Sequence, residues 1–255
     1  MHDQGKSHTH DQTWQAQVLR FTAFSATPFV NGDRWWLDQI GDAPEQEVTQ
    51  PRKQGHQQTG PHLGGILTLV RVPGRVDWLL KAAPDLDTPD FESLGHYTEV
   101  ISQFRDFVGQ WLRREKLLDV QRLAFGAVLV QPVSTLGEGY ACLQRYLPFL
   151  TYDPENTSDL TFQVNRVRAS RCGPEQLRIN RLAKWSVLTV QIFEAIPDAT
   201  PSPFRSTHNR LASCLEWDLN TQADWTDGLE PRFHDPLLAE LVDLGLEIAQ
   251  SGDTP

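Results

Sequence analysis

The stretch GGILTLVRVPGRVDWLLKA, residues 64–82, decides the fold. Two runs of strand-favouring residues flank the dipeptide Pro73-Gly74 in its middle. Proline presets φ at the first central position of a tight turn, and glycine accepts a positive φ at the second. The stretch therefore predicts an antiparallel β-hairpin.

Hydrophobic periodicity predicts further elements on both sides of this hairpin. Residues 17–24 alternate between apolar and polar and predict a strand, and residues 34–41 predict a short helix. Apolar residues recur at spacings of three and four over 94–114, which indicates a helix with a broad buried stripe. Residues 121–133 are almost continuously apolar and predict a central strand covered on both faces. The first half therefore has the order β-α-β-β-α-β, the ferredoxin-like pattern.

The second half predicts the order α-β-β-β-α. Its expected helix, three strands and leucine-rich closing helix cover residues 137–147, 160–168, 177–193, 210–220 and 235–250. Residues 42–62 show little periodicity and predict a long loop.

We therefore expect an α+β protein with a mostly antiparallel sheet. The polar residues 1–15 are interpreted as a mobile tail, and residues 16–255 as a single domain. A subdivision, if there were one, would fall near residue 134.

Composition narrows the class of protein. The chain has 255 residues, 33 acidic against 23 basic side chains and a net charge of −10, which argues against a general nucleic-acid coat protein. Its apolar runs are far too short for a membrane span, and its first residues lack the features of a secretory signal. Three cysteines without CxxC spacing indicate reduced thiols, so we expect a cytoplasmic location without membrane contact.

One segment is basic although the chain as a whole is acidic: NRVRASRCGPEQLRINRLAK, residues 165–184. Against one acid, Glu175, it carries the basic residues Arg166, Arg168, Arg171, Arg178, Arg181 and Lys184. Strand alternation places Arg166 with Arg168, and Arg178 with Asn180, on shared faces, so the segment predicts a hairpin with a positive face. Arginine grips phosphate or carboxylate with a planar fork of donors. The alternative is an outer sheet face neutralised by the protein's own acids.

A second candidate site is LEWDLNT, residues 215–221. On a strand, Glu216 and Asp218 point outward together, and two such carboxylates can share a hard metal ion. With Arg178 or Arg181 holding phosphate, this pair would suit a metal-dependent nuclease or phosphodiesterase. Simple alternation on a solvated strand face explains the same pattern.

Other functional motifs are missing from the sequence. No HExxH, Cys-His zinc spacing, GxSxG or phosphate-binding glycine loop occurs, so we expect no cofactor and no resident metal. Trp35 and Trp36 are adjacent, and we expect one of them to remain available as an apolar contact for a partner.

Three strings support a family resemblance: RLAFGAVLVQPV from residue 122, LRINRLAKWSVLTVQ from residue 177 and LEWDLNT from residue 215. With the final leucine-rich helix, they make residues 65–250 resemble a sporadically distributed bacterial family of uncharacterised proteins. The resemblance supplies no catalytic residues. The patchy distribution of that family implies a link with mobile or defence-associated genes.

The sequence thus predicts a non-enzymatic binding component of a bacterial cytoplasmic assembly. The arginine-rich hairpin would dock an acidic protein surface or a nucleic-acid backbone, with Trp35 or Trp36 as the apolar anchor. The alternative is the phosphodiesterase that uses Glu216 and Asp218. A third hypothesis is self-association, in which the positive hairpin meets the acidic C-terminal half of another copy.

Overall fold

A computed structural model describes residues 13–29, 32–50, 52, 54–84, 91–115, 119–195 and 204–253. For the strand ends 192–195 and 204–208 it describes the backbone alone. The N-terminal residues 1–12, which form most of the predicted tail, lie outside the described part.

Within the described part, eleven strands form one sheet in the order β2-β3-β4-β5-β1-β7-β11-β10-β8, with β6 beside β1 and β9 beside β10. Every pairing is antiparallel. The strands are β1 (Gln15–Ser25), β2 (Gln46–Gln50), β3 (Gly55–His62), β4 (Gly65–Val72), β5 (Arg75–Lys81), β6 (Gly95–His96), β7 (Val120–Val133), β8 (Thr161–Asn165), β9 (Arg168–Ala169), β10 (Arg178–Ala195) and β11 (Phe204–Thr221).

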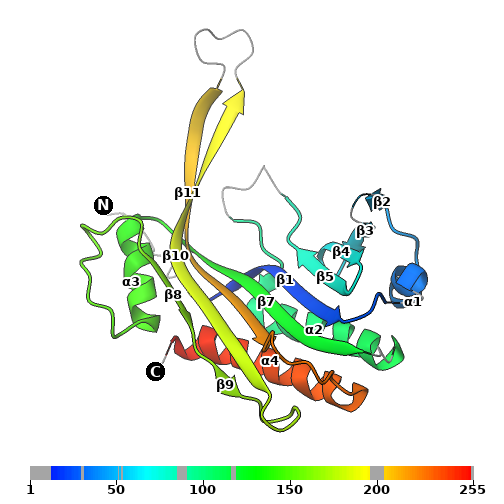
Figure 1. Cartoon of the computed structure of the whole chain (residues 1–255). Coiled ribbons are helices and arrows are strands. Elements are labelled where there is room, and N and C mark those ends of the chain that lie inside the picture. Colours follow the sequence, from blue (N-terminus) through cyan, green and yellow to red (C-terminus); the bar gives the residue numbers. More distant parts are fainter. Residues whose placement is uncertain are drawn as a thin grey trace, which may run out of the picture.

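The helices are α1 (Trp35–Ile40), α2 (Tyr97–Glu115), α3 (Leu136–Tyr146) and α4 (Pro231–Ser251), with a 3-10 turn, η1, at Gly32–Arg34. Figure 1 shows α2 and α4 side by side beneath the sheet, while the other face of the sheet carries no helix among the described residues. The α+β class and the mostly antiparallel sheet are therefore confirmed.

The predicted hairpin is present as β4 and β5, which pair from Ile66↔Lys81 to Val72↔Arg75. Gly74 has a φ of 72°, the left-handed conformation that the turn requires. The hairpin places the apolar residues Leu67, Leu69, Val76, Trp78 and Leu80 in the core.

The loop predicted over 42–62 is wrong, because it contains the hairpin β2–β3. β2 is exposed along its whole length and β3 is rich in Gln, Gly and His, so neither gives a hydrophobic alternation. The two strands are held by backbone pairing and by Trp36, whose ring fills the space above Gly60. Together with β6, they interrupt the β-α-β-β-α-β order expected for the first half.

The N-terminal side of β1 belongs to the core. Trp14 is buried, and its indole Nε1 donates a hydrogen bond to the carbonyl of Ala249 in α4 at 3.1 Å. The interpretation of residues 1–15 as a tail therefore does not hold for residues 13–15.

One continuous sheet joins the two halves of the chain across residue 134. β7 pairs with β1 along one edge and with β11 along the other. No helix in the described ranges is both long and apolar enough to cross a membrane.

Candidate functional site: a groove on the open sheet face

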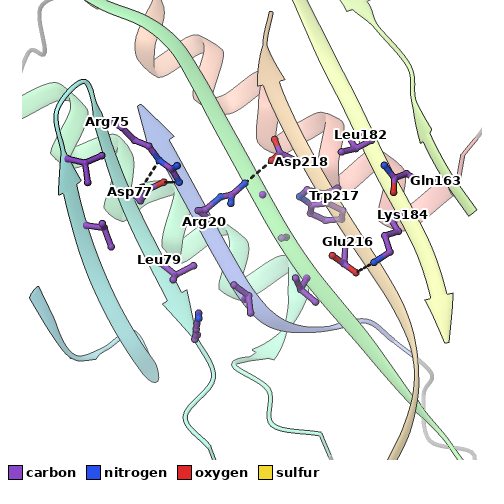
Figure 2. Close-up of a pocket in the computed structure, with 17 residues that line it drawn as sticks. Arg20, Arg75, Asp77, Leu79, Gln163, Leu182, Lys184, Glu216, Trp217 and Asp218 are labelled. Carbon is purple, nitrogen blue, oxygen red and sulfur yellow. Dashed lines mark hydrogen bonds and ion pairs between the residues drawn. The ribbon is translucent and has the colours of Figure 1, made fainter. Parts of the chain in front are cut away.

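The sheet curls over its helix-free face and encloses a groove of about 760 Å³, which we call the sheet groove. Its walls and floor come from seven adjacent strands, β4, β5, β1, β7, β11, β10 and β8. Figure 2 shows side chains from β5 and from β10 facing each other across β1, β7 and β11. This volume lies in the range of ligand-binding clefts.

A glycine in β7 shapes the floor of the sheet groove. Arg20, Gly126 and Asp218 are neighbours across β1, β7 and β11. Arg20 Nη2 donates to Asp218 Oδ2 at 2.7 Å and so crosses the intervening strand. A Cβ at position 126 would lie 3.7 Å from Arg20 Nη2 and 3.3 Å from the carbonyl oxygen of Trp217. Gly126 therefore places no side chain between Arg20 and Asp218, and the tighter contact of an added Cβ would be with the Trp217 carbonyl.

Two further ion pairs flank this one. Lys184 Nζ lies 2.8 Å from Glu216 Oε1, and this hydrogen bond, together with the charge of Glu216, raises the pKa of the Lys184 ammonium. On the opposite wall, Arg75 donates to Asp77 at 2.8 Å, and Thr22 Oγ1 donates to the same carboxylate at 2.6 Å. Each of the three groove carboxylates thus has a cationic partner.

The lining combines an excess of positive charge with aliphatic surface. Its cations are Arg20, Arg75, Lys81 and Lys184, and its carboxylates are those of Asp77, Glu216 and Asp218. Lys81 is exposed and makes no ion pair with any described residue. Partly exposed aliphatic side chains lie between the charges: Val18, Val70, Val72, Leu79, Val128 and Leu182. The groove is thus suited to a ligand that is apolar in part and acidic in part.

The expectation that β7 is covered on both faces holds along part of the strand. Leu123, Phe125 and Leu129 are buried in the main core. On the other face, Val130 is buried in a smaller cluster with Ala212 and Cys214, whereas Gly126 and Val128 line the sheet groove.

Glu216 and Asp218 point outward from β11 as predicted, and both line the sheet groove. However, Glu216 forms an ion pair with Lys184, and Asp218 forms one with Arg20. Asp218 Oδ1 also accepts a hydrogen bond from Asn220 Nδ2 at 2.8 Å. Among the described residues no group of three His, Cys, Asp or Glu side chains could hold a metal ion. A metal at this pair would have to displace both cations.

The predicted arginine-rich hairpin is present, since β8 and β9 both pair with β10. Three of its arginines turn toward the C-terminal part of α4. Arg166 forms a two-point ion pair with Asp253, with both distances 2.7 Å. Arg168 lies 3.0 Å and Arg181 lies 3.5 Å from Glu247 Oε1.

These contacts correct the expectation of one positive hairpin face. Alternation along β10 turns Arg181, which is only 6% exposed, toward the helices. Lys184 lies on the opposite face, in the sheet groove, and Arg178 is exposed without an ion pair in the described part of the chain. For Arg166, Arg168 and Arg181 the structure shows the alternative, internal neutralisation by the protein's own acids.

Trp35 and Trp36 are both buried, at 2% and 1% exposure, so neither is an exposed anchor. Adjacent helical residues point about 100° apart, and α1 lies in a corner that accepts both directions. Trp35 packs edge-on against Trp111 and donates from Nε1 to Glu115 at 2.7 Å. Trp36 stacks on Trp78.

Sequence analysis did not single out Arg20, Arg75 or Lys81. These residues lie on β1 and β5, far in sequence from the arginine-rich segment. The sequence did contain a signal for them: each lies next to a buried residue of an alternating strand and so points away from the core. Arg20, between Leu19 and Phe21, is an example.

No protein-family model matches the chain, and no curated protein matches it. The function is therefore inferred from the geometry of the sheet groove.

Proposed function

We propose that the protein is a non-enzymatic binding component of a bacterial cytoplasmic assembly and docks an acidic segment of a partner protein in the sheet groove. The observation that carries this proposal is a positively charged, partly aliphatic groove in a chain of net charge −10. Local charge rather than total charge attracts a ligand at this range, because salt screens distant charges. The setting in a defence-associated assembly comes from the family resemblance alone.

The chemistry of the lining favours a protein segment over a nucleic acid. Single-stranded nucleic acids are bound by aromatic stacking and by cations that contact phosphates. In the sheet groove, three of four cations are already paired, and the aliphatic side chains between them are valine, leucine and alanine. Trp217 also lines the groove, but it is only 4% exposed and its ring lies against Gly245 of α4, so it offers no open face for stacking. An extended segment with alternating apolar and acidic side chains matches both the aliphatic surface and Lys81.

The arginine-rich hairpin keeps a part in this proposal. Its groove-facing residues Gln163, Leu182 and Lys184 form one wall of the site. Arg166, Arg168 and Arg181 pair with Glu247 of α4 and with Asp253 just beyond it, and so hold this end of the chain against the sheet. One face of the hairpin would thus bind the partner, and the other face stabilises the fold.

The first half also supports a relation to the ferredoxin-like pattern. Its strands β4, β5, β1 and β7 are neighbours in the sheet, in that order, and are antiparallel. α1 contacts α2 through a hydrogen bond from the side chain of Gln39 to the carbonyl of Phe107. This relation would not by itself assign a function, because that architecture hosts many.

Fluorescence anisotropy with three labelled peptides tests the docking proposal. The peptides alternate leucine with glutamate, glutamine or lysine. We expect the leucine-glutamate peptide to bind and the leucine-lysine peptide not to bind. Lys81→Glu and Leu182→Glu should each weaken binding by about tenfold or more, since each places a negative charge beside the acidic ligand.

Two control variants make this experiment specific. Arg105→Glu changes the same charge on α2, on the helix-covered side of the sheet, and should leave binding unchanged. Arg166→Ala should lower the melting temperature and leave binding unchanged, because Arg166 pairs with Asp253. Failure of the leucine-glutamate peptide to bind, or binding that both groove variants leave intact, contradicts the proposal. Labelled single-stranded RNA that competes for the groove would instead favour nucleic acid.

One observation keeps the phosphodiesterase as a second candidate: Glu216 and Asp218 share the sheet groove with Arg20 and Lys184. Because both carboxylates are paired, we expect no cleavage of labelled RNA or DNA in the presence of Mg²⁺ or Mn²⁺. The matched control is Glu216→Gln, which removes the charge and keeps the shape. Cleavage by the wild type that this variant abolishes would replace the binding proposal with the enzymatic one.

A further inference from the structure

The hairpin β10–β11 extends beyond the body of the protein as a two-stranded ribbon (Figure 1). β8 pairs with β10 only as far as Ser186, and β7 pairs with β11 only as far as Leu211. The two strands pair with each other on to Ala195↔Phe204, with one register shift between Ile192 and Phe193 that leaves β10 without an extra residue. Both outer edges of this ribbon are therefore unpaired within the described residues.

The base of the ribbon is held to the body, and its outer part is uncovered. Arg210 is buried and lies 2.9 Å from Glu92. Farther out, Thr189, Val190 and Gln191 are exposed, with Val190 at 42%. An isolated two-stranded ribbon is marginally stable in water, and an unpaired edge is a template for another strand.

The two edges differ in sequence. The β10 edge, TVQIFEA at 189–195, contains β-branched and aromatic residues that favour strands. It has no lysine or proline, the residues that natural edge strands use against pairing, and its single charge is Glu194. The β11 edge, FRSTHN at 204–209, is more polar and carries Arg205 and His208.

In one register, the β10 edges of two copies of the chain can pair with each other without placing like charges opposite one another. When two copies pair antiparallel about Ile192, Glu194 of one copy lies opposite Val190 of the other. Gln191 then lies opposite Phe193, so no like charges face each other. If two copies of 204–209 paired antiparallel about the centre of that segment, Arg205 of each copy would lie opposite His208 of the other. The β11 edge is therefore less suited to self-pairing.

We propose that the β10 edges of two copies of this chain pair antiparallel about a twofold axis at Ile192. The two ribbons then form one four-stranded sheet with an isologous interface. The occupant of the edge is a second copy, because the segment is complementary to itself. This dimer uses a surface separate from the sheet groove, so either proposal can fail without the other.

Sedimentation equilibrium of the full chain tests the association. We expect a dimer that dissociates on dilution. The double variant Val190→Lys/Ile192→Lys should dissociate at a concentration about tenfold higher or more, because lysines at an edge oppose pairing. The control Ser206→Lys/Asn209→Lys adds the same charge to the β11 edge and should leave the dimer intact. Far-ultraviolet circular dichroism and the melting temperature establish that each variant is folded.

A crosslinking experiment tests the register. In a Cys172→Ser background, which removes the exposed thiol, Ile192→Cys brings two thiols together at the twofold axis. Directly opposed strand residues, above all in non-hydrogen-bonded pairs, come close to the Cβ separation that a disulfide spans. We expect Ile192→Cys to form a covalent dimer on oxidation and Thr189→Cys, which lies opposite Ala195, not to form one.

Three results would overturn the proposal. The first is a wild-type chain that stays monomeric at every concentration. The second is a dimer that the Val190→Lys/Ile192→Lys variant retains or that the β11-edge control loses. The third is a covalent dimer that forms as readily with Thr189→Cys as with Ile192→Cys.

Discussion

Gly126 shows how one residue shapes the candidate site. The sequence around it, residues 121–133, is almost continuously apolar, which led to the expectation of a strand covered on both faces. In the structure, the guanidinium of Arg20 passes over Gly126, which has no side chain, and reaches Asp218 on β11, beyond β7. Strand alternation could predict that Arg20 and Asp218 point away from the core, but only the register of three strands brings them together.

At the same scale, His234 predicts how stability depends on pH. It is buried in α4, and its Nε2 donates to the carbonyl of Leu229 at 2.8 Å. Burial lowers the pKa of His234 in the folded protein below the value of about 6.5 that an unfolded chain retains. Acidification below pH 6.5 therefore protonates the unfolded chain first. The stabilising contribution is complete above that pH and is lost as pH falls toward the folded pKa.

The free energy of unfolding should fall on this account by at most about 1.4 kcal/mol per pH unit. Burial also lowers the pKa of His62, so protonation of His62 at low pH should likewise lower the free energy of unfolding. Urea unfolding between about pH 5 and pH 7.5 measures the slope. His234→Gln should flatten it, whatever the variant does to absolute stability. Equal slopes for variant and wild type would show that His234 is not responsible.

At the scale of elements, α4 explains why the arginine-rich hairpin is not free. Sequence analysis predicted the leucine stripe of this helix, which packs in the core. It did not use Glu240 and Glu247, which are seven residues apart and so lie on one side of a helix. Glu240 accepts hydrogen bonds from the backbone of the hairpin, and Glu247 pairs with Arg168 and Arg181. This spacing was the sequence signal for internal neutralisation.

The elements that were predicted correctly are those with strong hydrophobic periodicity. β4, β5, β7, α2 and α4 bury regular apolar stripes, so their type followed from spacing alone. β2 was missed because an exposed strand at the edge of a sheet needs only backbone partners. β3 was missed because its buried positions are glycine and glutamine and give no apolar alternation. Trp35 and Trp36 were misread because the corner between sheet and α2 accepts side chains from two directions.

At the scale of the whole molecule, the sheet groove exists only because the sheet curls. Its four cations come from β1, β5 and β10, whose order in the sheet differs from their order in the chain. No local pattern encodes that curvature or brings Lys81 to the same groove as Lys184. The class of fold was therefore predictable from the sequence, whereas the position of the candidate site required the three-dimensional arrangement.

The central position of β7 predicts that the chain folds as one cooperative unit. β7 lies between β1 and β11, and Arg113 of α2 pairs with Asp235 of α4 at 2.7 Å. A cut after residue 134 would leave β7 with an unpaired edge and would expose the sheet face of β11 and α4. We expect the separate fragments 1–134 and 135–255 to be unfolded.

Amide dispersion in nitrogen-proton correlation spectra measures the folding of each fragment. Mixing the fragments should restore dispersion, because β7 and β11 can then pair along the ten residue positions from Leu211↔Val133 to Asn220↔Ala124. In the intact chain, urea unfolding followed by tryptophan fluorescence and by circular dichroism should give one coincident transition. Two separate transitions, or dispersed spectra from either fragment alone, would mean that residue 134 divides two domains. In that case the sheet groove, whose walls come from both sides of residue 134, would lie at a domain boundary.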